Sequence, residues 1–187
     1  MRIACLGWGS LIWSPRELPL TTKTWNSDGP ELPVEFARKS KDGRVTLVLV
    51  ENYSEVQTLW APLNVSSMEE AKSALAVREG ISASNIQYSI GYVENRSNSQ
   101  HGKCADNIRQ WANSKDLEGV VWTNLKFGMD QNRDKMPSSA DVLAHFEKLS
   151  REQRATAEEY VRKTPAQVAT PYRSVFESKL GWYADPE

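Results

Sequence analysis

The stretch that organises this chain is Ala4-Cys5-Leu6-Gly7-Trp8-Gly9-Ser10-Leu11-Ile12-Trp13. Its apolar beginning, residues 3–6, predicts a short buried strand, and the two glycines predict a tight turn. Glycine can adopt positive φ and lets the backbone approach a ligand closely. Successive N–H groups in such a turn can bind a carboxylate or another anion. In that hypothesis Trp8 forms a wall of the concavity and the Ser10 hydroxyl adds a donor. The plain alternative is a strand end that leads into a turn.

Two other motifs do not fit this turn. A dinucleotide-binding fingerprint needs a third glycine three positions after Gly9, where the chain has Ile12. A nucleophile elbow needs glycine on both sides of its serine, whereas Gly7 and Gly9 both precede Ser10. We therefore do not expect Ser10 to be a nucleophile.

The composition indicates one globular domain. The chain has 187 residues and a net charge of −1, with acidic and basic residues interspersed. A chain of this length buries roughly 70% of its unfolded surface. We expect neither nucleic acid nor a membrane as partner, and no apolar run has the length of a signal peptide or a membrane span. The two cysteines, Cys5 and Cys104, lie far apart, which favours free thiols, a reducing compartment and a cytoplasmic location.

Hydrophobic patterning predicts a chain that begins with strands and ends with helices. Apolar or alternating segments predict further strands over residues 32–39, 44–50, 56–63, 86–93 and 118–123. In the strand over 32–39, Val34 and Phe36 form the buried face, opposite Glu35 and Arg38.

Helical spacing and capping residues predict helices in the second half of the chain. They cover residues 105–112, the region from Pro137 to 149, the region from Ser150 to before Pro165, and Thr170-Pro171 to Gly181. Residues 16–31, 95–104 and 126–136 are predicted as loops.

A further helix is predicted between two of the strands. Ser66-Ser67-Met68-Glu69-Glu70 contains two overlapping capping boxes, and Gly80 is suited to end the helix. Glu79 then lies in the last turn beside Arg78. The negative end of the helix dipole disfavours a charged carboxylate there, so we expect a raised pKa for Glu79. The alternative is a solvated glutamate that pairs with Arg78 or with a lysine.

Both segments resemble motifs of the γ-glutamylcyclotransferase superfamily. Trp8-Gly9-Ser10-Leu11-Ile12-Trp13 is similar to the Tyr-Gly-Ser-Leu-Ile-Trp run of its ChaC-type members, with tryptophan in place of the usual tyrosine. The catalytic glutamate of the superfamily lies in a Glu-Gly element between a short helix and a tyrosine-containing strand, and Arg78-Glu79-Gly80-Ile81 resembles that element. The likeness covers about residues 2–95.

The resemblance implies a single domain over residues 1–187, with a mixed sheet that closes into a small β-barrel, surrounding helices, and a helical C-terminal extension over about 137–181. It implies that 5-oxoproline is released from a small γ-glutamyl substrate when the substrate's α-amine attacks its own γ-carbonyl. Glu79 would be the general acid and base, and one cavity would hold it together with the turn. The implied substrate-binding residues are Gly7, Trp8, Gly9, Ser10, Leu11 and Tyr88.

This reaction needs neither a metal nor a redox cofactor, because the nucleophile belongs to the substrate. The leaving amine and the oligomeric state stay open. The competing hypothesis is a non-catalytic module on the same fold that binds a small ligand or a protein, because one fold hosts many functions.

Other candidate residues have weaker support. His101 and Cys104 are too few to hold a metal, and a nucleophilic pair of Cys104 with His145 lacks an orienting third group. We expect His145 to be exposed. Either Arg38 or Arg44 could clamp a substrate carboxylate.

Overall fold

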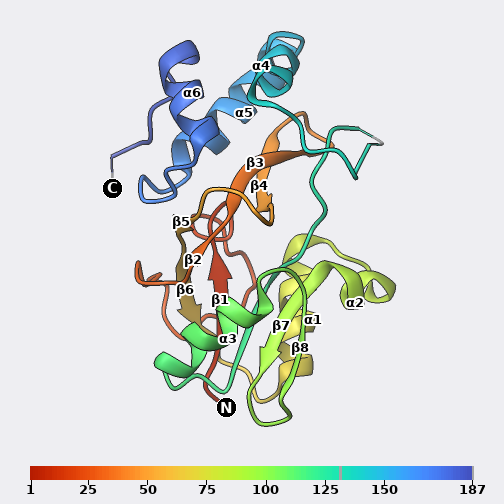
Figure 1. The fold of residues 1–187 in the computed structure, drawn as a ribbon, viewed down its shortest axis with the longest axis vertical. Coiled ribbons are helices and arrows are strands. Elements are labelled where there is room, and N and C mark those ends of the chain that lie inside the picture. The colour runs from red at the N-terminus through yellow and green to blue at the C-terminus, as the bar shows by residue number, and fades with distance from the viewer. Residues whose placement is uncertain (131, 187) are drawn as a thin grey trace. The chain divides into compact units, whose positions relative to one another are not determined.

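The computed structural model describes residues 1–130 and 132–186, and it confirms the α+β class (Figure 1). Its contacts divide the chain into two compact units. The first comprises residues 1–7, 14–31 and 57–125, and the second comprises residues 8–13, 32–56 and the chain from 126 onward. The chain passes from one unit to the other after residues 7, 13, 31, 56 and 125. The short strands β2 (Glu31–Leu32) and β5 (Val56–Gln57) pair with each other. That the whole chain is one domain stays a prediction.

The first unit is built on a five-stranded sheet in the order β6-β1-β9-β7-β8. In its interior, β1 (Ile3–Gly7) runs antiparallel to β6 (Leu59–Pro62) and parallel to β9 (Gly119–Thr123). Beyond β9, β7 (Ile90–Glu94) runs antiparallel to both β9 and β8 (Ser99–His101). Every residue of β1 and β9 is buried, as expected for continuous apolar runs in a sheet interior.

The implied barrel is not found. A barrel requires that the two edge strands of a sheet pair with each other, but β6 and β8 are the free ends of the strand order in the five-stranded sheet. The remaining pairs, β2 with β5 and β3 (Val34–Lys39) with β4 (Val45–Leu49), are two-stranded. Within the described residues the sheets are therefore open.

Two helices pack on the sheet of the first unit, where α1 (Met68–Glu79) and α3 (Ala105–Ser114) both contact β7 and β9. The helix α1 begins and ends as predicted. The Ser67 side chain caps it by accepting the Glu70 N–H, and Gly80 ends it with a left-handed φ of 66°. The Glu70 carboxylate turns to the preceding residue, where it accepts from the N–H and the hydroxyl of Ser66 at 2.8 and 2.7 Å.

The predicted strand over residues 86–93 is wrong in its first half. A short 3-10 turn, η1 (Ala83–Asn85), leads directly into α2 (Ile86–Ser89), and β7 begins only at Ile90. The Asn85 N–H donates to the Ser82 carbonyl at 2.9 Å, so the turn continues as helix. β8 lies in a segment that was predicted to be a loop. The sequence pattern missed this strand because a three-residue polar edge strand has no apolar alternation.

The second unit combines the β3–β4 hairpin with α4 (Ser139–Glu147), α5 (Arg151–Lys163) and α6 (Pro171–Leu180). The helices α5 and α6 begin at the predicted caps Ser150 and Thr170, and Ser138 caps α4 within the region that was predicted to start a helix at Pro137. Their core is aromatic: ring centroids are 5.4 Å apart for Phe36–Phe176, 5.4 Å for Phe146–Phe176 and 5.0 Å for Phe146–Trp182.

Candidate active site

Glu79 is the last residue of α1, and its side chain is 19% exposed. The Nη1 atom of Arg78 donates to Glu79 Oε1 at 2.6 Å, while Nε and Nη2 of the same guanidinium donate to the Ser14 carbonyl at 3.2 and 2.7 Å. The Arg78 side chain is only 6% exposed, so it ties the helix end to the segment that starts at Ser14. The pairing with Arg78, one of the two alternatives for Glu79, is present in the structure.

Glu79 lies near the first strand. Burial raises the pKa of the Cys5 thiol far above its usual range, the Glu79 carboxylate raises it further, and Arg78 opposes both. Cys5 is fully buried in β1, two positions before Gly7. The thiol therefore stays protonated, and Cys5 is the buried apolar residue that its place in a strand predicts.

The two glycines of the turn do not have the predicted conformation. Neither Gly7 nor Gly9 adopts positive φ, so that expectation is wrong. Both positions need glycine because aromatic side chains approach their Cα atoms. A methyl group at Gly7 would come within 2.6 Å of Trp25 Cζ3, and one at Gly9 would overlap the Tyr160 hydroxyl.

From Trp8 onward the turn belongs to the second unit. The Trp8 indole is 4% exposed and its Nε1 donates to the Leu47 carbonyl at 3.3 Å, so β4 orients the ring. Leu11 is buried and Ser10 half-buried. The turn is closed by a hydrogen bond from the Ile12 N–H to the Gly9 carbonyl at 3.0 Å.

Two N–H groups of the turn are left without a backbone acceptor in the part of the chain that the structure describes. Among the described residues, the N–H groups of Gly9 and Leu11 donate to no backbone carbonyl. Two donors in one turn can bind a carboxylate or an oxyanion. That Glu79 and this turn line one cavity stays a prediction.

Tyr88 is the remaining predicted binding residue. It lies on α2 with 66% of its surface exposed, and its carbonyl accepts from Asn124 Nδ2 at 3.2 Å. Its ring makes no stacking contact within the part of the chain that the structure describes.

The other candidates are engaged within their own unit. The Arg44 guanidinium pairs with Asp42 at 2.7 Å and lies 5.3 Å from the centre of the Tyr160 ring. Arg38 Nη1 donates to the Lys126 carbonyl at 2.7 Å. His145 is half-buried, not exposed as predicted, because its Nε2 lies 2.7 Å from the Gly43 carbonyl oxygen.

The structure also buries the carboxylate of Glu35, which the alternation of the strand over residues 32–39 places on the solvent face. Glu35 of β3 is fully buried, since strand alternation fails where both faces of a strand are covered. The carboxylate accepts from Thr170 Oγ1 at 2.6 Å, from the Phe36 N–H at 2.8 Å and from the Tyr172 N–H at 3.1 Å. Burial raises the pKa of Glu35, and these three hydrogen bonds oppose the rise. The sequence held one signal that the start of α6 takes an acceptor from elsewhere in the chain: its first turn has no acidic residue of its own.

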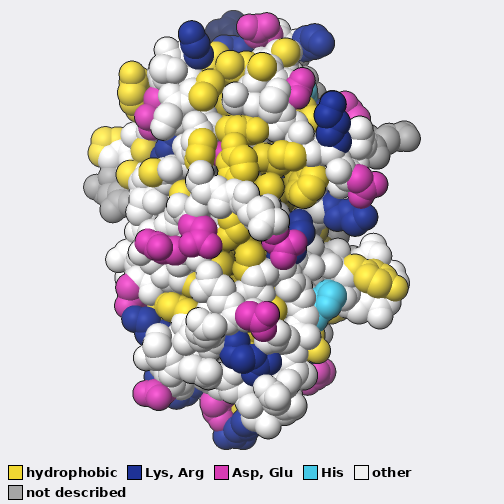
Figure 2. Space-filling view, in the orientation of Figure 1, with side chains coloured by type: hydrophobic (Ala, Val, Ile, Leu, Met, Phe, Trp, Pro, Cys, Tyr) yellow, Lys and Arg dark blue, Asp and Glu magenta, His cyan; other side chains and the backbone are white. Residues whose placement is uncertain are grey.

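Comparison of the chain with protein-family models, with curated proteins and with solved structures gave no match. In the described residues no three His, Cys, Asp or Glu side chains gather as a metal site would require. No described helix has the length and apolar character to cross a membrane. Figure 2 shows basic and acidic side chains interspersed on the face that it draws, with no large patch of one sign.

Proposed function

We propose that this protein is a γ-glutamylcyclotransferase-like enzyme, an amine-releasing acyltransferase or lyase that forms 5-oxoproline from a small γ-glutamyl compound. The observation that carries the proposal is the position of Glu79. Its carboxylate is partly exposed at the end of α1 and acts electrostatically on Cys5 in the strand that leads into the glycine turn. Arg78 occupies Oε1, and no described residue donates to Oε2, which is therefore the oxygen proposed to carry the proton.

The reaction needs one ring closure and the transfer of two protons from the attacking nitrogen to the leaving nitrogen. The α-amine nitrogen of the substrate forms a bond to its γ-carbonyl carbon, and the bond from that carbon to the leaving nitrogen breaks. Glu79 is proposed to take the first proton from the α-ammonium group, which makes the amine nucleophilic, and the second from the same nitrogen as the ring forms; both pass to the leaving nitrogen, which is released as an ammonium group. Orientation of the two reacting groups supplies much of the rate enhancement, since they belong to one molecule. The N–H groups of Gly9 and Leu11 are proposed to bind the substrate carboxylate or the developing oxyanion.

A non-catalytic binding module is the second candidate, and one contact favours it. The Tyr160 hydroxyl occupies the space that Gly9 leaves open, and it also accepts the Leu47 N–H at 3.2 Å. The close approach at this glycine therefore serves internal packing. In this hypothesis the Glu79–Arg78 pair stabilises the helix end and carries no proton.

The test is 5-oxoproline release from glutathione, a γ-glutamyl amino acid and a γ-glutamylamine. We expect turnover with at least one of them, and we expect Glu79→Gln to lower it by about 10²- to 10⁴-fold, the range of general acid–base contributions. Substrate affinity should change far less, because glutamine keeps the shape of the side chain.

The matched control is Glu69→Gln. Glu69 lies at the other end of α1 and likewise pairs with a base, Lys72, at 2.9 Å, so this variant removes the same charge from the same helix. Turnover should stay within about twofold of the unmodified protein. Equal turnover in both variants, or no 5-oxoproline from any of the three substrates, would overturn the proposal.

A further inference from the structure

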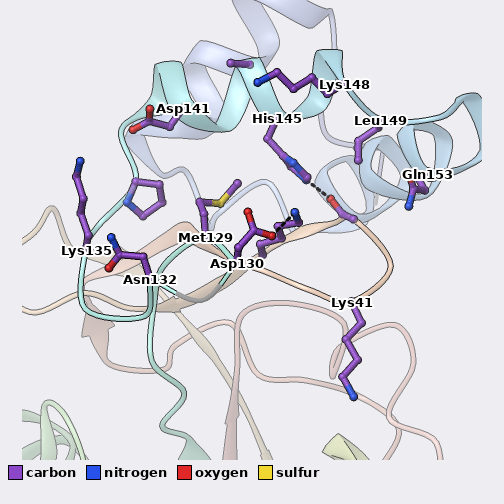
Figure 3. Close-up of a pocket in the computed structure, with 14 residues that line it drawn as sticks. Lys41, Met129, Asp130, Asn132, Lys135, Asp141, His145, Lys148, Leu149 and Gln153 are labelled. Atoms are coloured by element: carbon purple, nitrogen blue, oxygen red, sulfur yellow. Dashed lines mark hydrogen bonds and ion pairs between the residues drawn. The ribbon is translucent and has the colours of Figure 1, made fainter.

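The second unit contains a cavity of about 660 Å³ beside α4, and its charged side chains are spread out or already paired (Figure 3). Lys135 and Lys148 lie at opposite ends of the cavity. The Asp130 carboxylate pairs with Lys39 Nζ at 2.5 Å, and Asp141 is half of the capping box of α4. We assign no ligand to this cavity. Charged groups do meet in the first unit, at the end of α1.

At this helix end, one guanidinium joins the proposed general base to another segment of the first unit. The side chain of Arg78 is 6% exposed. Its Nη1 atom donates to Glu79 Oε1 at 2.6 Å, while Nε and Nη2 donate to the Ser14 carbonyl at 3.2 and 2.7 Å. The guanidinium is planar and presents its N–H groups in a fixed fork. Because all three nitrogen atoms are engaged at once, the fork fixes the distance between the carboxylate and the Ser14 carbonyl.

The contact between Arg78 and Glu79 is not one that a helix forms by itself. Successive residues of an α-helix point in directions about 100° apart, so side-chain pairs usually join residues three or four positions apart. Lys72 and Glu69 form such an ordinary pair in the same helix. The contact at the helix end needs a further constraint, and the two hydrogen bonds to the Ser14 carbonyl supply it.

The helix dipole gives no reason for a carboxylate at this place. The carboxyl end of a helix carries a partial negative charge, which favours Arg78 and disfavours Glu79. The ion pair offsets the unfavourable position of the carboxylate. Arg78 therefore does two things for Glu79: it compensates the charge and it fixes the place of one oxygen.

We propose that Arg78 is the positioning residue of Glu79, an inference that rests on the function proposed above. Arg78 holds Oε1, so Oε2 transfers the protons from a fixed place. A catalytic group has to be held within about 0.5 Å of its productive position, and the last residues of a helix fray unless they are tied down. A displacement of about 1 Å can lower a rate by about 10²-fold.

The decisive variant is Arg78→Lys. Lysine keeps the positive charge but has one compact ammonium group in place of the fork, so it cannot hold the Glu79 carboxylate and the Ser14 carbonyl in the same geometry. We expect kcat for 5-oxoproline release to fall by about 10- to 10²-fold. KM should stay within about threefold, because Arg78 acts on the proton transfer and not on substrate binding.

A double variant separates positioning from stability. In a protein that already carries Glu79→Gln, Arg78→Lys should change turnover less than about twofold, because the base that Arg78 positions is absent. Glu79→Asp tests the same geometry with Arg78 intact, since it keeps the charge and draws the carboxylate back by one methylene group. It should lower kcat at least about tenfold.

Arg109 offers a matched control in the same unit. Its guanidinium is also engaged at three atoms: Nε donates to Gln100 Oε1 at 2.7 Å, Nη1 to Asn95 Oδ1 at 3.2 Å and Nη2 to the Ser99 carbonyl at 2.9 Å. Arg109→Lys therefore breaks a comparable fork that holds no carboxylate. It should leave kcat within about twofold of the unmodified protein, and urea unfolding of both lysine variants measures what each fork contributes to stability.

The outcomes separate this inference from the proposed function. If Glu79→Gln impairs turnover while Arg78→Lys or Glu79→Asp does not, the positioning role is overturned and the proposed function stands. An equal fall in kcat for Arg109→Lys, or a full further loss from Arg78→Lys in the Glu79→Gln protein, would assign the effect to stability and likewise overturn the role. If the unmodified protein releases no 5-oxoproline, the proposed function fails and this inference fails with it.

Discussion

Glu79 and Glu35 are two glutamates that the folded chain treats in opposite ways. Glu79 is partly exposed at the end of α1 in the first unit, and a guanidinium neutralises it. Glu35 is fully buried in β3 of the second unit and is held by three uncharged donors. Among the described residues, no cation pairs with it.

The difference separates a carboxylate that solvent can reach from one that supports the fold. The Glu79 side chain is 19% exposed. The Glu35 carboxylate is enclosed at the N-terminal end of α6, where it supplies the acceptor that the Tyr172 N–H lacks inside its own helix. Burial by itself therefore does not make a carboxylate a candidate for function, because a ligand must also be able to reach it.

The largest stability effect should follow removal of the buried carboxylate. Glu35→Ala leaves three buried donors without an acceptor and opens a cavity, so we expect a loss of about 3 kcal/mol in the free energy of unfolding. Glu79→Ala should cost about 1 kcal/mol, because that carboxylate is partly solvated and Arg78 keeps its bonds to Ser14. Urea unfolding of both variants measures the two losses. A larger loss for Glu79→Ala would reverse the assignment of roles.

Stability should also depend on pH through Glu35. Its pKa in the folded state is raised above the unfolded value, so its stabilising contribution is fully present below the unfolded pKa and is lost as the pH rises through the folded pKa. Relative to Glu35→Gln, the unmodified protein should lose about 1.4 kcal/mol for each unit of pKa difference. Unfolding free energies of both proteins between about pH 4 and pH 8 give the comparison. A difference that stays constant, or that grows in favour of the unmodified protein, would contradict this expectation.

The smallest effect concerns the hydroxyl between Glu35 and α6. Thr170 donates to Glu35 Oε1 at 2.6 Å and accepts the Arg173 N–H at 3.2 Å. Thr170→Val removes this N-cap, so we expect a loss of about 1 kcal/mol. The substitution should also raise the pKa of Glu35 further, because the hydroxyl that lowers this pKa is gone. The pH range over which the free energy of unfolding changes should therefore move upward. Thr170→Ser should restore both properties. Chemical unfolding at several pH values is the measurement, and an unchanged pH range in Thr170→Val would argue against the coupling.

Helix ends were the most predictable feature of this chain. Ser67 caps α1 through the N–H three residues ahead, Gly80 ends it in the left-handed conformation, and Thr170 and Gly181 bound α6 in the same way. These interactions join residues within four positions of each other. Local spacing therefore carries them.

The candidate site was predictable only in its parts. The place of Glu79 at a helix end and the turn after β1 follow from local pattern, and both are present. The need for glycine at position 9 does not, since it depends on Tyr160, about 150 positions along the chain, whose hydroxyl leaves no room for a Cβ atom there. The prediction for Tyr88 failed for a local reason. The apolar alternation around it is too short to distinguish a helix from a strand, and it was interpreted as a strand although the segment is helical.

The sequence by itself determined the α+β class, the limits of the capped helices and the strand-to-turn transition at Gly7, because each depends on side chains and backbone groups that are neighbours along the chain. Only the tertiary structure decided that the five-stranded sheet is open and that Glu35 is buried against the start of α6. Strand order and burial depend on which distant segments meet, and the alternation of a strand is the same whether one of its faces or both are covered.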